Sequence, residues 1–145
     1  MVQVIKMEKL SDIKNIYGCK DPKELSPLVL AYIGDAVFEI FVRSKVLFEF
    51  GNAPVNKMHK RSREMVKAKG QSDMYFSIQN LLTDEEEAVF RRGRNAKSHT
   101  VPKNADLMDY RCATGLEAVF GYLYLKGDIK RLEELFTAGT DIKEK

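Results

Sequence analysis

The chain has 145 residues, of which 44% are hydrophobic and 31% charged, and its formal net charge is +3. This length is typical of one domain that buries a core without metal or disulfide staples. No apolar run reaches the roughly 18 residues of a membrane-spanning helix, and the mixed N-terminus does not resemble a signal or transit peptide. Cys19 and Cys112 lack partners at metal-ligand spacing, so we expect free thiols in a cytoplasmic protein without a membrane partner.

The residue pattern predicts an all-α fold of six helices. In chain order these helices cover about 27–50, 55–69, 72–81, 83–94, 105–126 and 128–137. Ser26 and Pro27 are typical of an N-cap followed by a first turn, and Gly51 should end the first helix. The second helix should end near Gly70. The N-terminal MVQVIKM is left open between a strand and a tail.

The fourth predicted helix carries its own start and end signals. Thr83 and Glu86 match a capping box. Acids fill the first turn and arginines the last, an order that complements the helix dipole. Residues 95–103, which follow, include Ser, Thr, Pro and Asn and favour a loop.

Positive charge gathers in two segments of the chain. Residues 57–69 carry six Lys or Arg and one acid, and residues 91–104 carry five Lys or Arg and no acid. Together the segments hold a net charge of +10, which leaves −7 for the rest of the chain. This asymmetry favours a basic face that binds a polyanion such as nucleic acid. The alternative, two solvated basic segments without a partner, stays open.

Two apolar segments each hold isolated acids. Residues 28–41 contain no charge other than Asp35 and Glu39, which are one helical turn apart, and residues 112–125 contain none other than Glu117. Helices that are apolar nearly all round lie at the centre of a fold. A carboxylate buried there without a partner costs several kcal/mol, so we expect a buried cation, a raised pKa or a metal ion to compensate.

Two glycines suggest how these segments meet. Gly34 precedes Asp35, and Gly115 lies two residues before Glu117. A glycine inside a helix costs about 1 kcal/mol relative to alanine, which the close approach of another helix would justify. If the helices cross at these glycines, the two carboxylates face each other and repel unless a cation lies between them. Oxygen ligands favour a hard ion such as Mg²⁺.

Two interpretations of these acids stay open. Each acid could pair with a buried arginine, for example Arg43 or Arg111. A shared Mg²⁺ beside a basic surface would instead favour a phosphodiesterase, an endonuclease or a phosphatase. The chain has no P-loop and no GxSxG motif. His59 and His99 lie in the basic segments, where exposure or phosphate contact is expected.

Two motifs resemble a known family. The sequence YIGDAVFE at residues 32–39 resembles the signature helix of the ribonuclease III family, and TGLEAVFGYLYL at residues 114–125 resembles its second metal-binding helix. The stretch RRGRNAKS, the PKN that follows and the short chain resemble the Mini-ribonuclease III subfamily, which consists of the nuclease domain alone. The resemblance extends over about residues 26–125.

The resemblance implies an all-helical ribonuclease III endonuclease domain: one domain over residues 1–145, with a core of about 26–137 and no double-stranded RNA-binding domain. It implies a homodimer that binds double-stranded RNA and hydrolyses it with Mg²⁺ as cofactor, leaving 5′-phosphate and 3′-hydroxyl ends. The implied substrate is precursor large-subunit (23S) ribosomal RNA, and helper proteins, ribosomal proteins included, stay open. Asp35 and Glu117 match the catalytic metal ligands, whereas Glu39 matches a structural residue.

The chain departs from the family pattern at three positions. Ala31 and Leu28 stand where full-length ribonuclease III enzymes carry Glu, and Thr114 stands where they carry Asp. The metal shell implied for this chain is therefore Asp35 and Glu117 with water. The alternative is a catalytically inactive, duplex-RNA-binding ribosome-assembly protein. Two acids retained within apolar helices favour the enzyme.

Charge and resemblance together indicate the RNA-binding residues. Duplex RNA is read through phosphates and 2′-hydroxyls, which suit Arg, Lys and Asn. The candidates are Arg91, Arg92, Arg94, Asn95, Lys97, Lys103 and Asn104. Weaker candidates, because one face of their helix must turn inward, are Lys57, Lys60, Arg61 and Arg63. Tyr32, Phe38 and Phe41 are expected in the core or in a dimer interface.

Overall fold

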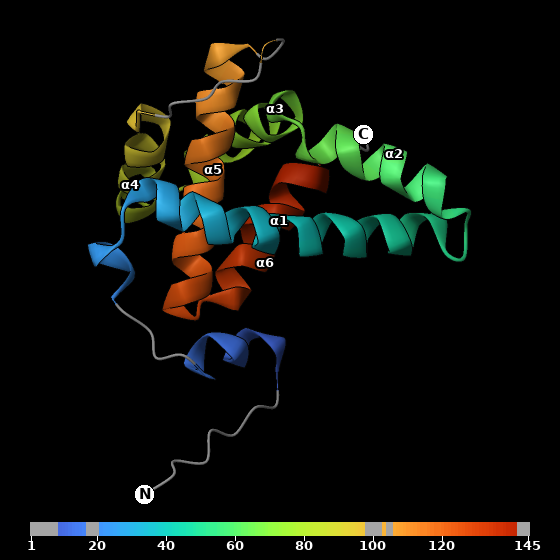
Figure 1. Cartoon of the computed structure of the whole chain (residues 1–145), viewed down its shortest axis with the longest axis horizontal. Coiled ribbons are helices and arrows are strands. Elements are labelled where there is room, and N and C mark those ends of the chain that lie inside the picture. The colour runs from blue at the N-terminus through green and yellow to red at the C-terminus, as the bar shows by residue number, and fades with distance from the viewer. Residues whose placement is uncertain (1–8, 17–20, 98–102, 104–105, 142–145) are drawn as a thin grey trace, which may run out of the picture.

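A computed structural model describes residues 9–16, 21–97, 103 and 106–141 of the chain. Within these ranges every regular element is a helix, which confirms the predicted all-α fold (Figure 1). The α-helices are α1 (Pro27–Phe50), α2 (Val55–Val66), α3 (Ala68–Ile78), α4 (Asp84–Asn95), α5 (Leu107–Lys126) and α6 (Ile129–Asp141), and the short 3₁₀ helices are η1 (Leu10–Ile16), η2 (Pro22–Glu24) and η3 (Gln79–Leu81). None of these helices is long and apolar enough to span a bilayer. The predictions for MVQVIKM, Cys19, His99 and Asn104 concern residues outside the described ranges.

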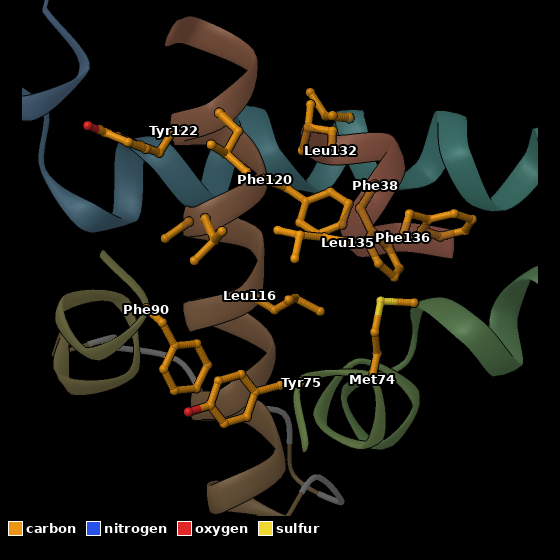
Figure 2. Close-up of a cluster of buried hydrophobic side chains, with 14 of the residues drawn as sticks. Phe38, Met74, Tyr75, Phe90, Leu116, Phe120, Tyr122, Leu132, Leu135 and Phe136 are labelled. Atoms are coloured by element: carbon orange, nitrogen blue, oxygen red, sulfur yellow. The ribbon is translucent and has the colours of Figure 1, made fainter. Parts of the chain in front are cut away.

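Helix α5 is the centre of the fold. Figure 1 shows α1 lying across α5, and α3, α4 and α6 also pack against α5. Side chains from these helices form one buried cluster (Figure 2). Within it the ring of Phe38 lies 5.3 Å from that of Phe120 and 5.9 Å from that of Phe136, both edge-on. Tyr75 stacks on Phe90 with ring centroids 3.6 Å apart. The two apolar segments are therefore central, as predicted.

The helix ends confirm most of the predicted capping. Ser26 Oγ accepts a hydrogen bond from the Val29 N–H at 3.3 Å, with Pro27 in the first turn. Thr83 and Glu86 form both bonds of the capping box, at 2.9 and 3.1 Å. Helix α1 ends at a glycine with positive φ, as expected where an L side chain would be strained. These ends satisfy backbone groups that helices otherwise leave unpaired.

The boundary between α2 and α3 differs from the prediction. The break falls at Lys67, which is extended with ψ of 157°, and not near Gly70. Gly70 lies in the first turn of α3, where an added Cβ would lie 2.8 Å from the carbonyl oxygen of Met65. This glycine lets α3 begin directly against the end of α2 instead of ending a helix. Helix α6 also runs past the predicted residue 137, to Asp141.

Glycines allow α1 and α5 to approach each other closely. A Cβ at Gly34 of α1 would overlap the carbonyl oxygen of Glu117, and Gly121 of α5 faces the α1 backbone in the same way. The predicted crossing at Gly115 is wrong. Gly115 faces α4, where an added Cβ would lie 2.6 Å from Phe90 Cδ2. Glycine in a helix signals close packing but does not tell which neighbour packs there.

Candidate active site

Asp35 and Glu117 line one pocket between α1 and α5. The pocket has a volume of about 480 Å³, and its other lining residues include Ala31, Tyr32 and Thr114. The contact of Gly34 with the Glu117 backbone brings the residues that follow it on α1 next to the middle of α5. The structure therefore brings together the two acids that the sequence analysis singled out.

The two carboxylates lie in different environments. Asp35 is exposed, although a buried acid was expected, and Glu117 is half-buried. Burial is the largest cause that raises the pKa of Glu117, to about 8, and a hydrogen bond with Asp35 and the charge of Asp35 add to it. A carboxyl with such a pKa keeps its proton at neutral pH. Without a cation, Glu117 is therefore protonated beside the Asp35 side chain.

The arginines considered as partners for these acids lie elsewhere. Arg43 Nε pairs with Glu39 Oε2 at 3.1 Å, and Arg111 is exposed. In the described part of the chain, no salt bridge reaches Asp35 or Glu117. Of the three compensations expected from the sequence, the arginine pairing is therefore wrong and the raised pKa of Glu117 is present.

The donor groups of this pocket fit Mg²⁺. The two carboxylates offer oxygen atoms, which Mg²⁺ prefers, and this ion keeps several waters and needs one or two protein carboxylates. Thr114 Oγ1 donates a hydrogen bond to the Tyr110 carbonyl oxygen at 3.1 Å, so it does not replace the acid of the family pattern as a charged ligand. Across the described residues, no group of three or more His, Cys, Asp or Glu side chains is placed to hold an ion. An ion in this pocket would therefore be coordinated by Asp35, Glu117 and water.

Gln71 of α3 is a further polar residue that acts on Glu117, and it was not predicted from the sequence. Its side chain is buried, with 2% exposure. The amide opposes the rise in the pKa of Glu117, although Nε2 completes no hydrogen bond with a described residue. A single glutamine just after the basic segment 57–69 gives no sequence signal of this kind, because its neighbour Glu117 lies far away along the chain.

The basic end of α4 packs beside this pocket. A Cβ at Gly93 would lie 2.9 Å from Gly115 Cα and 3.1 Å from the carbonyl oxygen of Thr114, a residue of the pocket wall. Arg92 Nη2 donates to the carbonyl oxygen of Leu25 at 3.4 Å, close to the start of α1. The basic end of α4 therefore packs on α5 at the pocket wall, and Arg92 reaches the segment before α1.

The other predicted RNA-binding residues of this region differ in their contacts. Arg91 Nε lies 3.6 Å from Glu87 Oε1. Arg94 lies over the Phe90 ring, with Cζ 5.9 Å from the centroid, and is half-buried. The remaining candidates that the structure describes are all exposed: Asn95, Lys97 and Lys103.

The weaker RNA-binding candidates on α2 differ in their contacts, and the aromatic residues expected in the core or a dimer interface differ in their exposure. Arg61 lies 3.7 Å from Glu49 and 3.6 Å from Glu64. The other basic candidates of α2 are exposed: Lys57, Lys60 and Arg63. Phe38 is a fully buried core residue and Phe41 is half-buried, as expected, whereas Tyr32 is 81% exposed and is not in the core of this chain.

Comparisons with known proteins show which family this chain belongs to. The ribonuclease III domain model matches residues 28–128. Mini-ribonuclease 3 of Clostridium tetani is 53% identical over 80% of this chain and 77% of its own length, and that of Thermoanaerobacter sp. is 47% identical over 83% and 84%. The crystal structure of protein FN1578 from Fusobacterium nucleatum superposes with a TM-score of 0.76 at 32% identity, covering 84% of this chain and 98% of that one. The chain therefore belongs to the Mini-ribonuclease 3 family of ribonuclease III-domain proteins.

Proposed function

We propose that this chain is an Mg²⁺-dependent endoribonuclease that cleaves double-stranded RNA, with precursor large-subunit (23S) ribosomal RNA as its substrate. One observation carries the proposal. Asp35 and Glu117 face one pocket without a basic partner among the described residues, beside the basic end of α4. Family membership supports a ribonuclease, and the paired acids supply what phosphodiester hydrolysis needs.

In this mechanism Asp35 and Glu117 hold the cation. Mg²⁺ held there would activate a water and stabilise negative charge on the phosphoryl oxygens, and breakage of the P–O3′ bond would leave 5′-phosphate and 3′-hydroxyl ends. Because burial and then Asp35 raise the pKa of Glu117 to about 8, Glu117 must lose its proton before it can serve as a ligand. The exposed position of Asp35 leaves it open to solvent and substrate, while the half-buried Glu117 is fixed in the fold.

The basic residues around the end of α4 position the duplex in this proposal. Arg91, Lys97 and Lys103 are exposed and suited to phosphate oxygens. Arg92 and Asn95 also lie on α4, close to Arg94, whose guanidinium lies over the Phe90 ring. Such contacts read the shape of duplex RNA and largely ignore base identity. Binding should therefore weaken steeply as salt rises.

We also propose that the chain acts as a homodimer in the cytoplasm, with each protomer a single nuclease domain that cuts one RNA strand. Support for the dimer comes from apolar side chains that α1 leaves exposed, among them Val29, Tyr32, Ile40, Leu47 and Phe48. Exposed apolar area of this kind is typical of a protein–protein interface. Free, buried Cys112 fits a reducing compartment. Sedimentation equilibrium of the whole chain tests the dimer.

The test of the proposed function is cleavage of an end-labelled RNA duplex with Mg²⁺. We expect wild type to cut, and Asp35→Asn and Glu117→Gln to bind the duplex without cutting it. Glu133→Gln, an exposed acid on α6, is the matched control and should cut normally. A wild-type chain that binds duplex but cuts in neither Mg²⁺ nor Mn²⁺ would overturn the proposal and favour the inactive RNA-binding alternative.

A further inference from the structure

Gln71 carries an unused hydrogen-bond donor in the protein interior. The residue is 2% exposed, and its Nε2 is the single buried side-chain nitrogen or oxygen without a partner among the described residues. A buried donor without a partner costs free energy, and native structures rarely keep one without a reason. An acceptor close to Nε2 would give a reason for this unpaired donor.

The fold fixes Gln71 firmly in this place. The residue lies in the first turn of α3, and its backbone N–H donates to the Lys67 carbonyl oxygen at 3.1 Å. Gly70 before it packs directly on the end of α2, and Ser72 after it is also 2% exposed. The α3 backbone therefore cannot easily move the amide away, so Gln71 stays where α3 packs on α5.

The acceptor within reach is the carboxyl group of Glu117. Among the residues that the structure describes, Gln71 and Asp35 are those whose side chains act on the Glu117 carboxyl, and Gln71 favours its charged form. Asp35 hydrogen-bonds to the same carboxyl and favours the neutral form. Glu117 therefore has two neighbours with opposite effects on its charge: Asp35, which is exposed, and the Gln71 amide, which is buried.

An amide suits this position better than a charged group. Lys or Arg beside Glu117 would neutralise the carboxylate and repel a cation in the pocket. The side-chain amide of Gln donates a hydrogen bond without adding net charge. A donor behind a ligand carboxylate fixes its orientation and leaves its other oxygen for the ion, and loss of such a partner typically lowers metal affinity by about 10–100-fold.

We propose that Gln71 is the positioning residue of this site, donating its Nε2–H to Glu117 when that carboxylate serves as a ligand. The inference rests on the proposed function, because it assumes a cation on Asp35 and Glu117. It adds a residue from a third helix, α3, to a site otherwise formed by α1 and α5. Gln71 touches neither substrate nor ion in this account and acts through Glu117.

The first test replaces Gln71 with Met, which keeps the length of the side chain and removes the donor. We expect the Kd for Mn²⁺, measured by electron paramagnetic resonance on the whole chain, to rise by about 10–100-fold. We expect kcat for duplex cleavage to fall while KM for RNA and the melting temperature hold. The same change at exposed Gln79, Gln79→Met, should alter none of these values. Unchanged Mn²⁺ affinity in Gln71→Met, or a lower melting temperature as its sole effect, would overturn the inference.

The second test uses NMR and needs no substitution at Gln71, so it applies even if Gln71→Met does not fold. In wild type, Mg²⁺ should shift the side-chain amide resonance of Gln71 in a ¹⁵N–¹H spectrum. In Asp35→Asn that shift should be lost. A Glu117 carboxyl that responds to Mg²⁺ while the Gln71 amide does not would overturn the inference and leave the proposed function standing. A wild-type chain that binds no cation would overturn the proposed function, and the role of Gln71 with it.

Discussion

Gly34 of α1 lies against the carbonyl oxygen of Glu117 on α5, so closely that no side chain fits between the two helices. This contact places Asp35, the next residue of α1, beside the Glu117 side chain in one pocket. The geometry of the proposed site therefore depends on a glycine that has no chemistry of its own.

Gly34→Ala should destabilise the protein and abolish cleavage together. The added Cβ would overlap the Glu117 carbonyl oxygen, which is backbone and cannot give way. We expect a loss of more than about 4 kcal/mol in the free energy of unfolding, measured by urea denaturation. Gly51→Ala is the control, because nothing lies within 4 Å of its Cβ and the strain of its positive φ should cost about 1–3 kcal/mol. Equal losses in the two variants would contradict this account of the crossing.

Arg131→Met should destabilise the link between α4 and α6. Burial alone would raise the pKa of Glu86, but hydrogen bonds from Arg131 and Thr83 hold it below its usual value. Arg131 donates to both Glu86 carboxylate oxygens at 2.9 Å. Its removal leaves a buried, unpaired charge, and we expect a loss of about 3–5 kcal/mol at pH 7 in urea denaturation.

The double variant Glu86→Gln/Arg131→Met checks this explanation. It removes the buried charge as well as its partner, so it should recover part of the stability that Arg131→Met loses. Because the folded-state pKa of Glu86 is lowered, its contribution is present above the unfolded value of about 4.5 and is lost as pH falls through the folded value. A loss in Arg131→Met that is equal at pH 7 and pH 3 would contradict the role of this charge.

Stability without added divalent cation should fall as pH rises from about 5 to 8. The folded-state pKa of Glu117 is about 8, against 4.5 for an ordinary Glu, so the folded state binds more protons than the unfolded state between these values. Linkage then lowers the free energy of unfolding as pH rises through this window. Urea denaturation in EDTA at several pH values measures the slope, and Glu117→Gln should remove it. An unchanged slope in Glu117→Gln would assign the effect to another group.

Lys97→Ala should weaken binding to every duplex RNA by a similar factor. Lys97 is exposed just after α4, and a phosphate contact carries no sequence information. The slope of log K against log salt concentration should fall by about 1, measured by fluorescence anisotropy with two unrelated duplexes. Lys130→Ala, an exposed lysine on α6, should leave both values unchanged. A loss confined to one duplex would instead indicate base recognition.

Local signals in the sequence predicted much of the fold. Ser26 with Pro27 and Thr83 with Glu86 mark helix starts through bonds between residues close in sequence, and both appear in the structure. The break at Lys67 was not predictable in this way. No residue there favours a stop, and Gly70, which does, serves tertiary packing instead. Features set by neighbours in the sequence were therefore predicted correctly, whereas features set by tertiary packing were not.

The sequence also predicted only part of the site, because the rest depends on how the helices pack together. Asp35 and Glu117 stood out because each is an acid in an apolar helix, and the structure places them in one pocket. The exposure of Asp35 depends on which side of α1 the other helices leave open. Gln71 comes from α3, which packs on α5 only in three dimensions, so its sequence context did not reveal it.

The most direct test of the central claim is Mn²⁺ binding, followed by electron paramagnetic resonance alongside duplex cleavage, in wild type, Asp35→Asn and Glu117→Gln. We expect that wild type binds the ion and cuts, and that each single substitution lowers both Mn²⁺ affinity and cleavage. Variants that still cut, or a wild type that cuts without binding the ion, would contradict the claim that Asp35 and Glu117 together hold the catalytic cation.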